Sequence, residues 1–507
     1  MDEQEEEFDE KKTRGGDRLH YSAFAFLLLL GTGLRFAYLF QPLRYDEVLT
    51  FFAYTSHPLT LALTKNQPPN NHLLHTLFVH LSIGLFGNAE WALRVPAFFA
   101  GVLIMPFTYL VFRKLYNRSA GFVAMALVVP SLLLINYSTN SRGYTMQTLF
   151  FLVLILIGAY LKEKSTPMRW VTFALFGFLI LYTMPTSVYF LGAVVLWLGI
   201  SALVKDTSDG RWRFIAKLAG AVAASGIVTV LLYIPVLLRS GLETITANPM
   251  VEPMHNLSDF IVGNFKLFRS VWFSWNVDVN LLIGIALAAC FVVSIVFHRK
   301  MSRDKVNLAV VTIGWCLLLI IAQRSVSFIR SWMPLLPLYL GFASAGLVFF
   351  TARSLRALQA RGVKFKPSQV LFVVVVLAFS IFLCSMVVAS TSAYQTDELG
   401  FPHRAASFKD CFAITSFLQK TLRAGDIVRV DHFVESTLEF DFLKEGIPAG
   451  YLADNLQGAE CVTKPSRTIY IESFSEGHTV ELRADEWRKV KVLKEFPYSR
   501  ILVVEQT

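Results

Sequence analysis

The sequence is poor in charged residues and lacks the common motifs that bind phosphate or zinc. Asp, Glu, Lys and Arg make up 17% of its 507 residues, whereas an average soluble protein has about 25%. Its five cysteines form no CxxC pair, which excludes the usual zinc and dithiol motifs. The sequence also has no glycine-rich phosphate loop and no internal repeat. Any reaction chemistry must therefore come from the few ionisable residues between the hydrophobic runs.

Long hydrophobic runs account for the low charge. Hydrophobic residues make up 54% of the chain, and its mean hydropathy is +0.51. Apolar runs of about 17 to 25 residues recur, which is the length of a helix that crosses a bilayer. We therefore expect a polytopic α-helical membrane protein, in which basic loops account for the net charge of +10 without a nucleic-acid partner. The expected spans are Tyr21–Phe40, Trp91–Phe112, Ala120–Ile135, Tyr144–Leu161, Trp170–Met184, Val188–Val204, Phe214–Leu238, Val279–Phe297, Val306–Ala322, Phe328–Phe350 and Val370–Ala389.

Clusters of Lys and Arg predict the topology. The ambiguous segment is His72–Phe86, which is apolar but carries three histidines. If this segment does not span, every basic cluster lies on the side of the N-terminus, as the positive-inside rule requires. We therefore expect His72–Phe86 to be an interfacial helix in a long first outer loop, with about eleven spans in total. The clusters are Lys11/Lys12/Arg14/Arg18, Arg113/Lys114/Arg118, Lys162/Lys164/Arg169, Lys205/Arg211/Arg213/Lys217, Arg299/Lys300/Arg303/Lys305 and Arg353/Arg356/Arg361/Lys364/Lys366.

Composition divides the chain into three regions. We expect a cytoplasmic tail at 1–18, a membrane domain at 19–393 and a small extracytoplasmic α/β domain at 394–507. Hydrophobic periodicity in the last region predicts helices and strands. The helices are Phe408–Leu422 and Glu435–Lys444, and the strands are Ile427–Val430, Thr468–Glu472 and Ile501–Val504. Cys411 and Cys461 lie in the same region and could pair in an oxidising compartment, a question that the sequence leaves open.

An acidic pair, Asp46 and Glu47, follows the first span within the motif RYDEVLTFFAY. A carboxylate at the outer membrane surface can act as a general base toward an acceptor hydroxyl. The structural alternative is that Asp46 caps a helix over Glu47–Tyr54, whose dipole Glu47 would favour. The two interpretations are compatible, because a capping aspartate can also be catalytic.

The same outer loop contains the polar run KNQPPNNHLLHTLF. We expect Asn70, Asn71 and His72 to begin the interfacial helix and to face a polar substrate. Lys65 lies just before them and could assist in binding a phosphate. His72 and His75 are spaced i, i+3 on one helix face, a spacing that can hold a divalent cation. No third ligand is evident, so histidines bonded to backbone and water are the alternative, and no cofactor is assigned with certainty.

Arginines stand at the outer ends of two later spans. Arg142, in the motif NYSTNSRGYT, precedes the fourth span, and Arg324 and Arg330 flank the turn before the tenth. A guanidinium group binds phosphate through two parallel hydrogen bonds, and charges next to hydrocarbon are costly enough to indicate function. Snorkelling to lipid headgroups is the alternative. We expect these three arginines to bind a donor phosphate. Tyr144, beside the first of them, is expected to contact the substrate.

Together these motifs resemble the GT-C glycosyltransferases. The resembling stretches, in order over residues 20–350, are YDE, PPNNHLLHTLFVHLSIGLFGNAEWALRVPAFFAGVL, YSTNSRGYTMQTLFFL and RSWMPLLPLYL. The branch that they resemble contains the protein O-mannosyltransferases and the lipid A aminoarabinose transferase. The resemblance implies a multi-helix membrane fold with interfacial helices in the first outer loop. It also implies inverting transfer of a single sugar from a polyprenyl-phosphate carrier to an acceptor on the non-cytoplasmic side.

The resemblance implies roles for individual residues. Asp46 matches the family's first-loop aspartate, the residue that activates or orients the acceptor, and Glu47 matches its acidic neighbour. Arg142 and Arg330 match basic positions near the lipid phosphate.

The sequence departs from the family where some members carry a second carboxylate. Lys65-Asn66-Gln67 stands before the proline pair, and Asn140 stands at the entry to the fourth span. Both positions lack an acid, which weakens a transferred metal site. The acceptor therefore stays open among a glycan, a lipid and a protein.

The sequence thus predicts an enzyme that transfers a hexosyl or pentosyl group from a polyprenyl-phosphate carrier to a cell-envelope acceptor. We expect it in the plasma (inner) membrane, surrounded by membrane lipid, with the N-terminus cytoplasmic and the C-terminal domain outside. A transporter or lipid flippase is the first rival, but it would place ionisable residues inside the spans and repeat its fold. A glycan polymerase or ligase is the second, and it would join preassembled oligosaccharides. A membrane anchor would not need so many spans.

Overall fold

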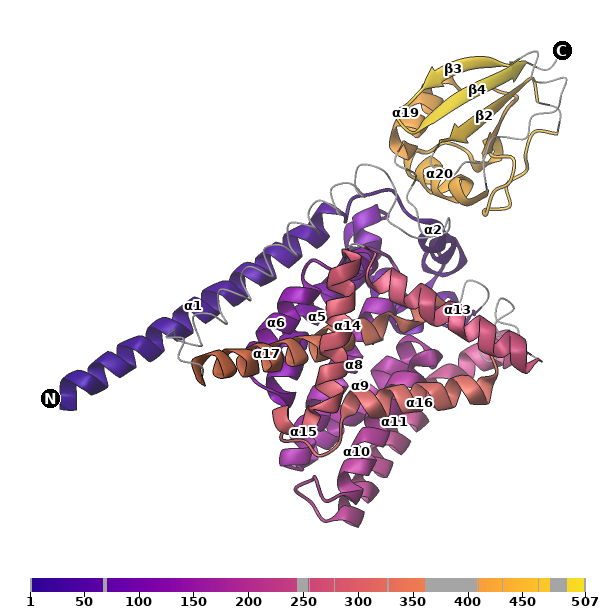
Figure 1. Cartoon of the computed structure of the whole chain (residues 1–507). Coiled ribbons are helices and arrows are strands. Elements are labelled where there is room, and N and C mark those ends of the chain that lie inside the picture. The colour runs from indigo at the N-terminus through magenta and orange to yellow at the C-terminus, as the bar shows by residue number, and fades with distance from the viewer. Residues whose placement is uncertain are drawn as a thin grey trace.

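The computed structural model comprises a helical body and a small α/β domain (Figure 1). It describes residues 2–66, 71–243, 254, 256–277, 279–325, 328–360, 408, 410–430, 432–463, 465–474 and 490–505. The elements of the body are α1 (Asp2–Ala37), α2 (Tyr45–Thr50), η1 (Phe51–Thr55), α3 (Leu59–Ala62), α4 (Leu73–Phe86), α5 (Glu90–Leu115), α6 (Arg118–Val128), α7 (Leu132–Ser138), α8 (Tyr144–Glu163), α9 (Pro167–Thr183), η2 (Pro185–Ser187), α10 (Val188–Leu203), α11 (Arg211–Ser240), α13 (Leu257–Trp275), α14 (Leu281–Val296), α15 (His298–Met301), α16 (Leu308–Gln323), η3 (Ile329–Leu335) and α17 (Leu336–Ala360).

Apolar helices pack side by side in the body. α5 packs against α6 and α8, α8 against α9, and α9 against α11, while α17 packs against α6 and α14. Their buried side chains form one large cluster, to which Phe112, Phe151 and Trp197 belong. The second half of α1 packs against α5 and α7, and the helix continues beyond the body to the N-terminus at its far end (Figure 1).

Apart from Ala120–Ile135, each expected span that lies within the described residues coincides with a helix. Five of these helices are long and apolar enough to cross a bilayer, and the bent pair α6 and α7 makes a sixth if it is counted as one span. α9, α14 and α16 are shorter apolar helices, and the expected span Val370–Ala389 lies outside the described residues. The protein is therefore a multi-pass membrane protein, while the total of about eleven spans stays a prediction.

The third expected span, Ala120–Ile135, is not one straight helix. The chain bends by 69° between α6 and α7, because Pro130 cannot donate the backbone hydrogen bond that would continue the helix. After the bend, Ser138 at the end of α7 packs against Gly101 of α5, where an added Cβ would lie only 2.0 Å from the Ser138 hydroxyl oxygen. The expected straight span is thus replaced by a broken one whose second half ends near α2 and α8.

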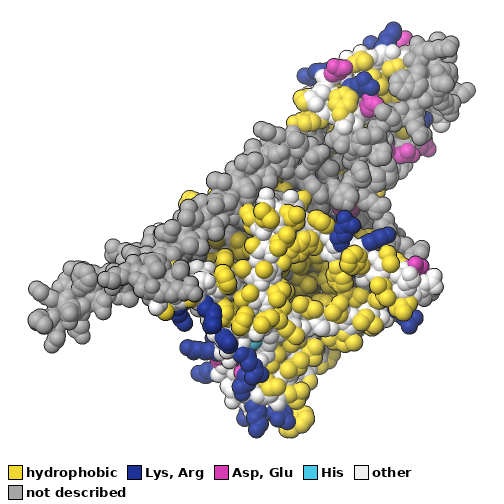
Figure 2. All heavy atoms as spheres, viewed as in Figure 1, with side chains coloured by type: hydrophobic (Ala, Val, Ile, Leu, Met, Phe, Trp, Pro, Cys, Tyr) yellow, Lys and Arg dark blue, Asp and Glu magenta, His cyan; other side chains and the backbone are white. Residues whose placement is uncertain are grey.

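Loops rich in Lys and Arg meet at one end of the body. The Lys162 ammonium lies 2.7 Å from a carboxylate oxygen of Asp206 and 2.7 Å from one of Asp304, so it joins three loops. Lys114, at the end of α5, pairs with Glu163, at the end of α8. Lys and Arg side chains gather at this end, away from the C-terminal domain (Figure 2). The basic clusters of these loops therefore lie on one side of the body, as the topology requires.

The C-terminal domain is a four-stranded sheet with two helices. The strand order is β1 (Asp426–Val430), β2 (Arg467–Ser473), β4 (Ser499–Glu505) and β3 (Lys491–Glu495). β1 and β2 are parallel, whereas β4 is antiparallel to both β2 and β3. Apolar side chains of the helices α19 (Cys411–Thr421) and α20 (His432–Glu445) pack against β1, β2 and β4. The expected helices and strands are present, and the domain limit near residue 394 lies outside the described residues and stays a prediction.

Cys411 and Cys461 are both free thiols in this domain. Cys411 is buried in the core and its thiol donates to the carboxylate of Asp441. The thiol of Cys461 donates to the Leu452 carbonyl at 3.0 Å. The structure therefore answers the question that the sequence left open, because the two cysteines have separate partners.

Candidate functional site

The acidic pair lies at the start of the short helix α2. Arg44 is the N-cap residue, and its backbone N–H donates to Glu47 Oε2 at 2.9 Å. In this arrangement a glutamate at the third helical position satisfies a backbone donor that the helix leaves free. Asp46 therefore does not cap the helix, contrary to the structural alternative considered from the sequence. Its carboxylate is available for other contacts.

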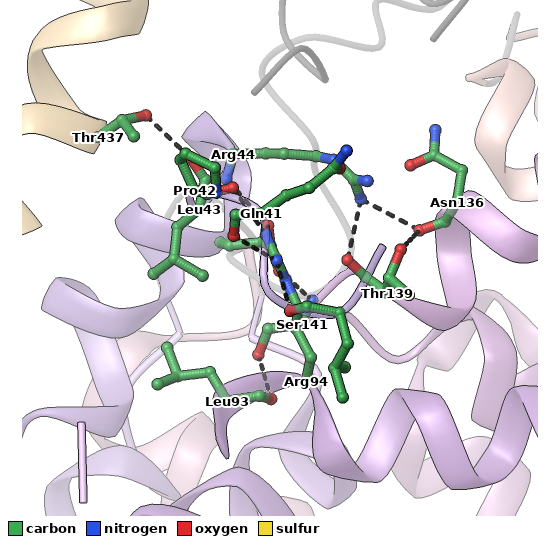
Figure 3. Close-up of polar contacts among 12 residues, drawn as sticks. Gln41, Pro42, Leu43, Arg44, Leu93, Arg94, Asn136, Thr139, Ser141 and Thr437 are labelled. Carbon is green, nitrogen blue, oxygen red and sulfur yellow. Dashed lines mark hydrogen bonds and ion pairs between the residues drawn. The ribbon is translucent and has the colours of Figure 1, made fainter. Parts of the chain in front are cut away.

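Glu47 is fully buried and connects three segments of the chain. Nε and Nη2 of Arg94 donate to its two carboxylate oxygens at 2.9 and 2.7 Å, and the Ser141 N–H donates to Oε1 at 2.6 Å. Arg94 also donates to three backbone carbonyls between α1 and α2 (Figure 3). Burial acts to raise the pKa of Glu47, but the charge and hydrogen bonds of Arg94 hold this pKa below its ordinary value. The pair thus fixes the start of α2 against α5 and the loop before α8.

Arg44 is also fully buried and reaches the end of α7. Its Nη1 donates to the carbonyls of Asn136 and Thr139 at 3.1 and 3.2 Å (Figure 3). A cation at a helix C-terminus interacts favourably with the helix dipole. Burial lowers the pKa of Arg44 to about 10, so it stays charged at neutral pH. Its Nε and Nη2 have no hydrogen-bond partner among the described residues.

Asp46 has different surroundings. Its side chain is 19% exposed, and its Oδ2 lies 3.2 Å from Nη1 of Arg330 in η3. The guanidinium of Arg330 also interacts with Tyr137 and Tyr144. The structure therefore joins the expected base to one of the expected phosphate ligands, across 284 residues of sequence.

Arg142 lies against the same helix. Its Nη1 donates to the Thr50 hydroxyl at 2.5 Å, and its Nη2 is 3.4 Å from Nε2 of His72. The Gly143 N–H donates to Nδ1 of His72 at 2.8 Å, which assigns the proton of the neutral ring to Nε2. Burial and the positive charge of Arg142 keep the pKa of His72 well below its ordinary value. His72 is thus a neutral group that presents an N–H donor beside Arg142.

Two tyrosines lie next to these groups. Tyr144, the first residue of α8, meets His72 and Tyr137 edge-on, with ring centroids 5.2 Å apart in each case. The sequence analysis included Tyr144 but missed Tyr137 and Thr50. Both residues lie in the motifs NYSTNSRGYT and RYDEVLTFFAY, but they are uncharged, so only their closeness in sequence to Arg142 and to Asp46 could have suggested them.

The loop before α4 uses its polar residues to hold its own shape. The side-chain amide of Asn71 donates to the carbonyls of Ala62 and Lys65 at 2.7 and 2.9 Å, and its oxygen accepts from the Thr76 hydroxyl. Asn71 therefore stabilises the loop, and the expectation that it faces a substrate is not supported. Lys65 is half-buried, and Asn70 lies outside the described residues.

Arg324 does not join the other arginines. It is exposed at the C-terminal end of α16, with a left-handed backbone at φ 49°, and its carbonyl accepts from the Met254 N–H. In the part of the chain that the structure describes, no contact links its guanidinium to Asp46 or Arg142. Of the two arginines expected at this turn, Arg324 and Arg330, Arg330 alone lies beside Asp46 within the described residues.

The histidine pair lies at the start of α4. Nδ1 of His72 already accepts from Gly143, and Nε2 of the buried His75 has no hydrogen-bond partner among the described residues. Within the described ranges, no three side chains of His, Cys, Asp or Glu gather in a metal-binding arrangement. A cation at His72 and His75 therefore finds no third protein ligand of these types among the described residues.

The site has an excess of positive charge among the described residues. Unbalanced charge in a buried place costs free energy unless a counter-ion is bound. Arg94 pairs with Glu47 and Arg330 with Asp46, while Arg44 is the N-cap residue of α2 and Arg142 donates to Thr50 at its end. Arg44, Arg142 and Arg330 each keep a nitrogen without a hydrogen-bond partner among the described residues. An anion with two negative charges would balance the four arginines against the two carboxylates.

An apolar groove opens next to the site. Side chains of α4, α5 and α8 line a cavity of about 430 Å³, in which Ser82 is the one polar side chain of the lining. Met146, in its wall, follows Tyr144 by two residues. Phe78, Phe86 and Phe99 line the groove and remain exposed. The groove is apolar and open, as a binding site for a hydrocarbon chain would be.

Known proteins share this architecture. Residues 66–233 match the model of the family described as dolichyl-phosphate-mannose-protein mannosyltransferase. No curated protein matches the sequence significantly. ArnT from Cupriavidus metallidurans in the apo state is similar in structure, with a TM-score of 0.54 and 14% sequence identity over 94% of this chain and 97% of ArnT. The protein has the GT-C fold of membrane glycosyltransferases. The resemblance inferred from the motifs is thus confirmed.

Two further structures show the same GT-C architecture. ArnT from the same organism bound to undecaprenyl phosphate has a TM-score of 0.53 and 13% identity, with coverage of 94% and 97%. The oligosaccharyltransferase of Archaeoglobus fulgidus, tethered to an acceptor peptide containing the NVT sequon, has a TM-score of 0.50 and 11% identity. The similarity extends over 83% of this chain and 63% of the oligosaccharyltransferase. At such identities the structures show the fold, and the family match supports glycosyl transfer as the general reaction.

Proposed function

We propose that this GT-C protein is an inverting glycosyltransferase that moves a single sugar from a polyprenyl-phosphate donor to an acceptor hydroxyl. The observation that carries the proposal is the ion pair of Asp46 with Arg330. It brings a partly exposed carboxylate, which can accept a proton, against a cation that can bind phosphate. The structure of ArnT with bound undecaprenyl phosphate supports a lipid-linked donor in this fold.

In the proposed reaction, the acceptor oxygen attacks the anomeric carbon of the donor from the face opposite the phosphate. The acceptor proton passes to Asp46 as the new carbon–oxygen bond forms. The bond between the anomeric carbon and the phosphate oxygen breaks, and polyprenyl phosphate leaves with the bonding electron pair. A single displacement of this kind inverts the configuration of the sugar carbon.

The arginines stabilise the leaving phosphate. Arg142 and Arg330 each keep Nε without a partner among the described residues, so both have donors to offer. A bound phosphate competes with Asp46 for Arg330, which frees the carboxylate to accept the acceptor proton. The Nε2–H of His72 adds a neutral donor beside Arg142. Fixed donors aimed at the developing negative charge lower the barrier.

Glu47 has a different role in the proposal. All of its described contacts hold α2, α5 and the loop before α8 together. Its carboxylate is fully buried and bound by Arg94. Glu47 therefore acts as a positioning residue for Asp46, and Asp46 alone is proposed as the base.

The orientation follows from the two ends of the body. α5 and α8 begin near the site and end at the basic loops, and a helix of 20 residues such as α8 is about 30 Å long. The positive-inside rule then places the basic end in the cytoplasm, and the site and C-terminal domain outside. The groove between α4, α5 and α8 holds the isoprenoid chain. We propose a plasma-membrane location and a hydroxyl acceptor on a glycan, lipid or protein.

The first test compares the purified wild-type protein with Asp46→Asn. A panel of radiolabelled polyprenyl-phosphate sugars is offered with native membrane extract as the acceptor. Asp46→Asn keeps the shape of the side chain but removes the base, and we expect the rate to fall by roughly 10²- to 10⁴-fold. The product of the wild type should be heavier by one sugar, whereas a polymerase would add a whole oligosaccharide.

Asp209→Asn is the matched control for this test. Asp209 also pairs with a cation, Lys217 at 2.7 Å, but it lies at the basic end of the body. We expect this variant to keep full activity. Undiminished transfer by Asp46→Asn contradicts the assignment of the base, and absence of any turnover by folded wild-type protein contradicts the function.

A further inference from the structure

The C-terminal domain makes direct contact with the segment that carries Asp46. Phe440 of α20 is 1% exposed, although the core of its own domain does not contain it. It is buried in a separate cluster with Leu43, Val48 and Phe51 and with one residue each from α4 and α5. Its ring meets that of Phe51 edge-on, with centroids 5.1 Å apart. A side chain of the small domain is thus inserted into the outer rim of the helical body.

Two polar contacts flank this insertion. The Thr437 hydroxyl donates to the Leu43 carbonyl at 3.0 Å (Figure 3), and the Lys444 ammonium lies 2.7 Å from Glu90 at the start of α5. Thr437, Phe440 and Lys444 are spaced three and four residues apart, so they lie on one face of α20. This face is docked at three points on the segment around α2 and on α5.

The neighbouring face of α20 belongs to the small domain. Leu438 and Phe442 are buried in the domain core together with Ile414 of α19 and Ile469 of β2. One helix therefore contributes to two separate cores. α20 therefore links the packing of the small domain to the position of α2.

α2 is too short to hold its own position. It has six residues, and helices below about 12 residues are marginal in water without packing partners. The pair of Glu47 with Arg94 fixes its start, and Phe440 packs on residues that bracket Asp46 in the chain, from Leu43 to Phe51. Loss of the second support leaves the carboxylate of Asp46 less firmly placed.

We propose that α20 is a positioning element for the transfer reaction, in which Phe440 holds α2 so that Asp46 stays within reach of the acceptor hydroxyl. This inference rests on the proposed function of Asp46. Phe440 touches no reacting atom and acts through the packing of α2. Catalysis is sensitive to such packing, because a misplacement of about 1 Å can lower a rate roughly 100-fold.

The test compares Phe440→Ala with Phe442→Ala in the full-length protein, under conditions at which both variants are folded and monodisperse. Both remove the same ring from the same helix, one from the seam with α2 and the other from the domain core. We expect Phe440→Ala to lower kcat roughly 10- to 100-fold with little change in the KM for the donor. Phe442→Ala should keep the wild-type kcat per folded molecule. Phe440→Leu, which refills most of the space, should restore most of kcat.

Equal loss of kcat in both alanine variants, or no loss in either, overturns the proposal. If Phe440→Ala does not fold, Thr437→Val supplies the second measurement, since it keeps the side-chain shape and removes the hydrogen bond to Leu43. A lower kcat at unchanged KM then supports the proposal, and an unchanged kcat overturns it. A wild type that transfers no sugar contradicts the proposed function itself, so the two failures are distinguishable.

Discussion

At the scale of residues, Asp46 and Glu47 are neighbours in sequence that differ in how their carboxylates are bound. Glu47 is fully buried and accepts hydrogen bonds from two backbone N–H groups and twice from Arg94. A proton on this carboxylate would displace one of these donors, which is costly in a buried place. Asp46 has a single described ion pair and is partly exposed. This difference supports the proposal that Asp46 is the base and Glu47 is a positioning residue.

Glu47→Gln tests this division. The substitution leaves the guanidinium of Arg94 buried without its anion, and breaking a buried ion pair costs about 3 to 5 kcal/mol. We expect a clear fall in the thermal unfolding temperature of the detergent-solubilised protein, together with reduced activity. Asp46→Asn, the matched neighbour, should unfold close to the wild-type temperature although it loses activity. An unfolding temperature of Glu47→Gln equal to that of the wild type, with activity abolished, would instead assign chemistry to Glu47.

The motifs in the sequence could select residues that the structure brings together, but not predict which of them pair. The motif around Asp46 and the two arginines at span ends, Arg142 and Arg330, are brought together as the resemblance implied. The partnership of Glu47 with Arg94 could not be predicted, because it joins an outer loop to a helix 47 residues away. The same holds for Arg44, whose guanidinium binds carbonyls 92 and 95 residues further along.

At the scale of elements, the loop between α7 and α8 controls where Arg142 lies. The break at Pro130 sets the direction of α7, and Arg44 binds the carbonyls at its end. The Ser141 N–H is held by Glu47, and the Gly143 N–H is held by His72. The loop is therefore held by residues of the segment between α1 and α5.

Gly143→Ala tests whether the position of this loop matters for donor binding. An added Cβ would lie 2.9 Å from Thr183 Cγ2 and 3.2 Å from the His72 side chain, so the loop must shift. We expect the KM for the donor to rise by roughly tenfold or more, because Arg142 moves with the loop. Gly199→Ala is the matched control, since nothing lies within 4 Å of its added Cβ. Equal donor KM values for Gly143→Ala and the wild type would show that the loop is not part of the phosphate site.

Among the elements that the sequence did not predict, α13 and β3 have a physical explanation. α13 runs from Leu257 to Trp275, between the expected spans Phe214–Leu238 and Val279–Phe297. It mixes charged residues with large apolar ones, so it has neither the continuous apolar run of a span nor the polarity of a loop. β3 (Lys491–Glu495) is exposed at every position, and without a buried face it has no alternation to recognise. The spans and the buried strands were predictable because burial leaves a periodic trace in sequence.

At the scale of the whole molecule, charge separates the two ends of the body. Basic loops meet at one end (Figure 2), and the arginines of the site lie at the other with their carboxylates. The C-terminal domain is attached at the second end through α20, which links its core to α2. Unfolding of the C-terminal domain would therefore remove a support of α2. The buried carboxyl groups of this domain make its stability depend on pH.

Asp441 is the principal group in this dependence. It lies on α20, accepts from the thiol of Cys411 and faces Glu90, Lys444 and Glu445. Burial raises the pKa of Asp441 from 3.8 to about 7. Between these values the folded protein keeps a proton that the unfolded chain has released, so rising pH favours the unfolded chain. The contribution of Asp441 to stability therefore falls as the pH rises through this window and reaches its lower level above about pH 7.

The measurement is the thermal unfolding temperature of wild type and Asp441→Asn between about pH 4 and pH 8. Asn still accepts from the thiol but does not titrate, so we expect its unfolding temperature to fall less with pH. Burial also raises the pKa of Glu435 to about 7, which leaves part of the dependence in the variant. Glu445→Gln, an exposed position on the same helix, should keep the wild-type slope. An identical slope in wild type and Asp441→Asn would show that Asp441 ionises freely in the folded protein.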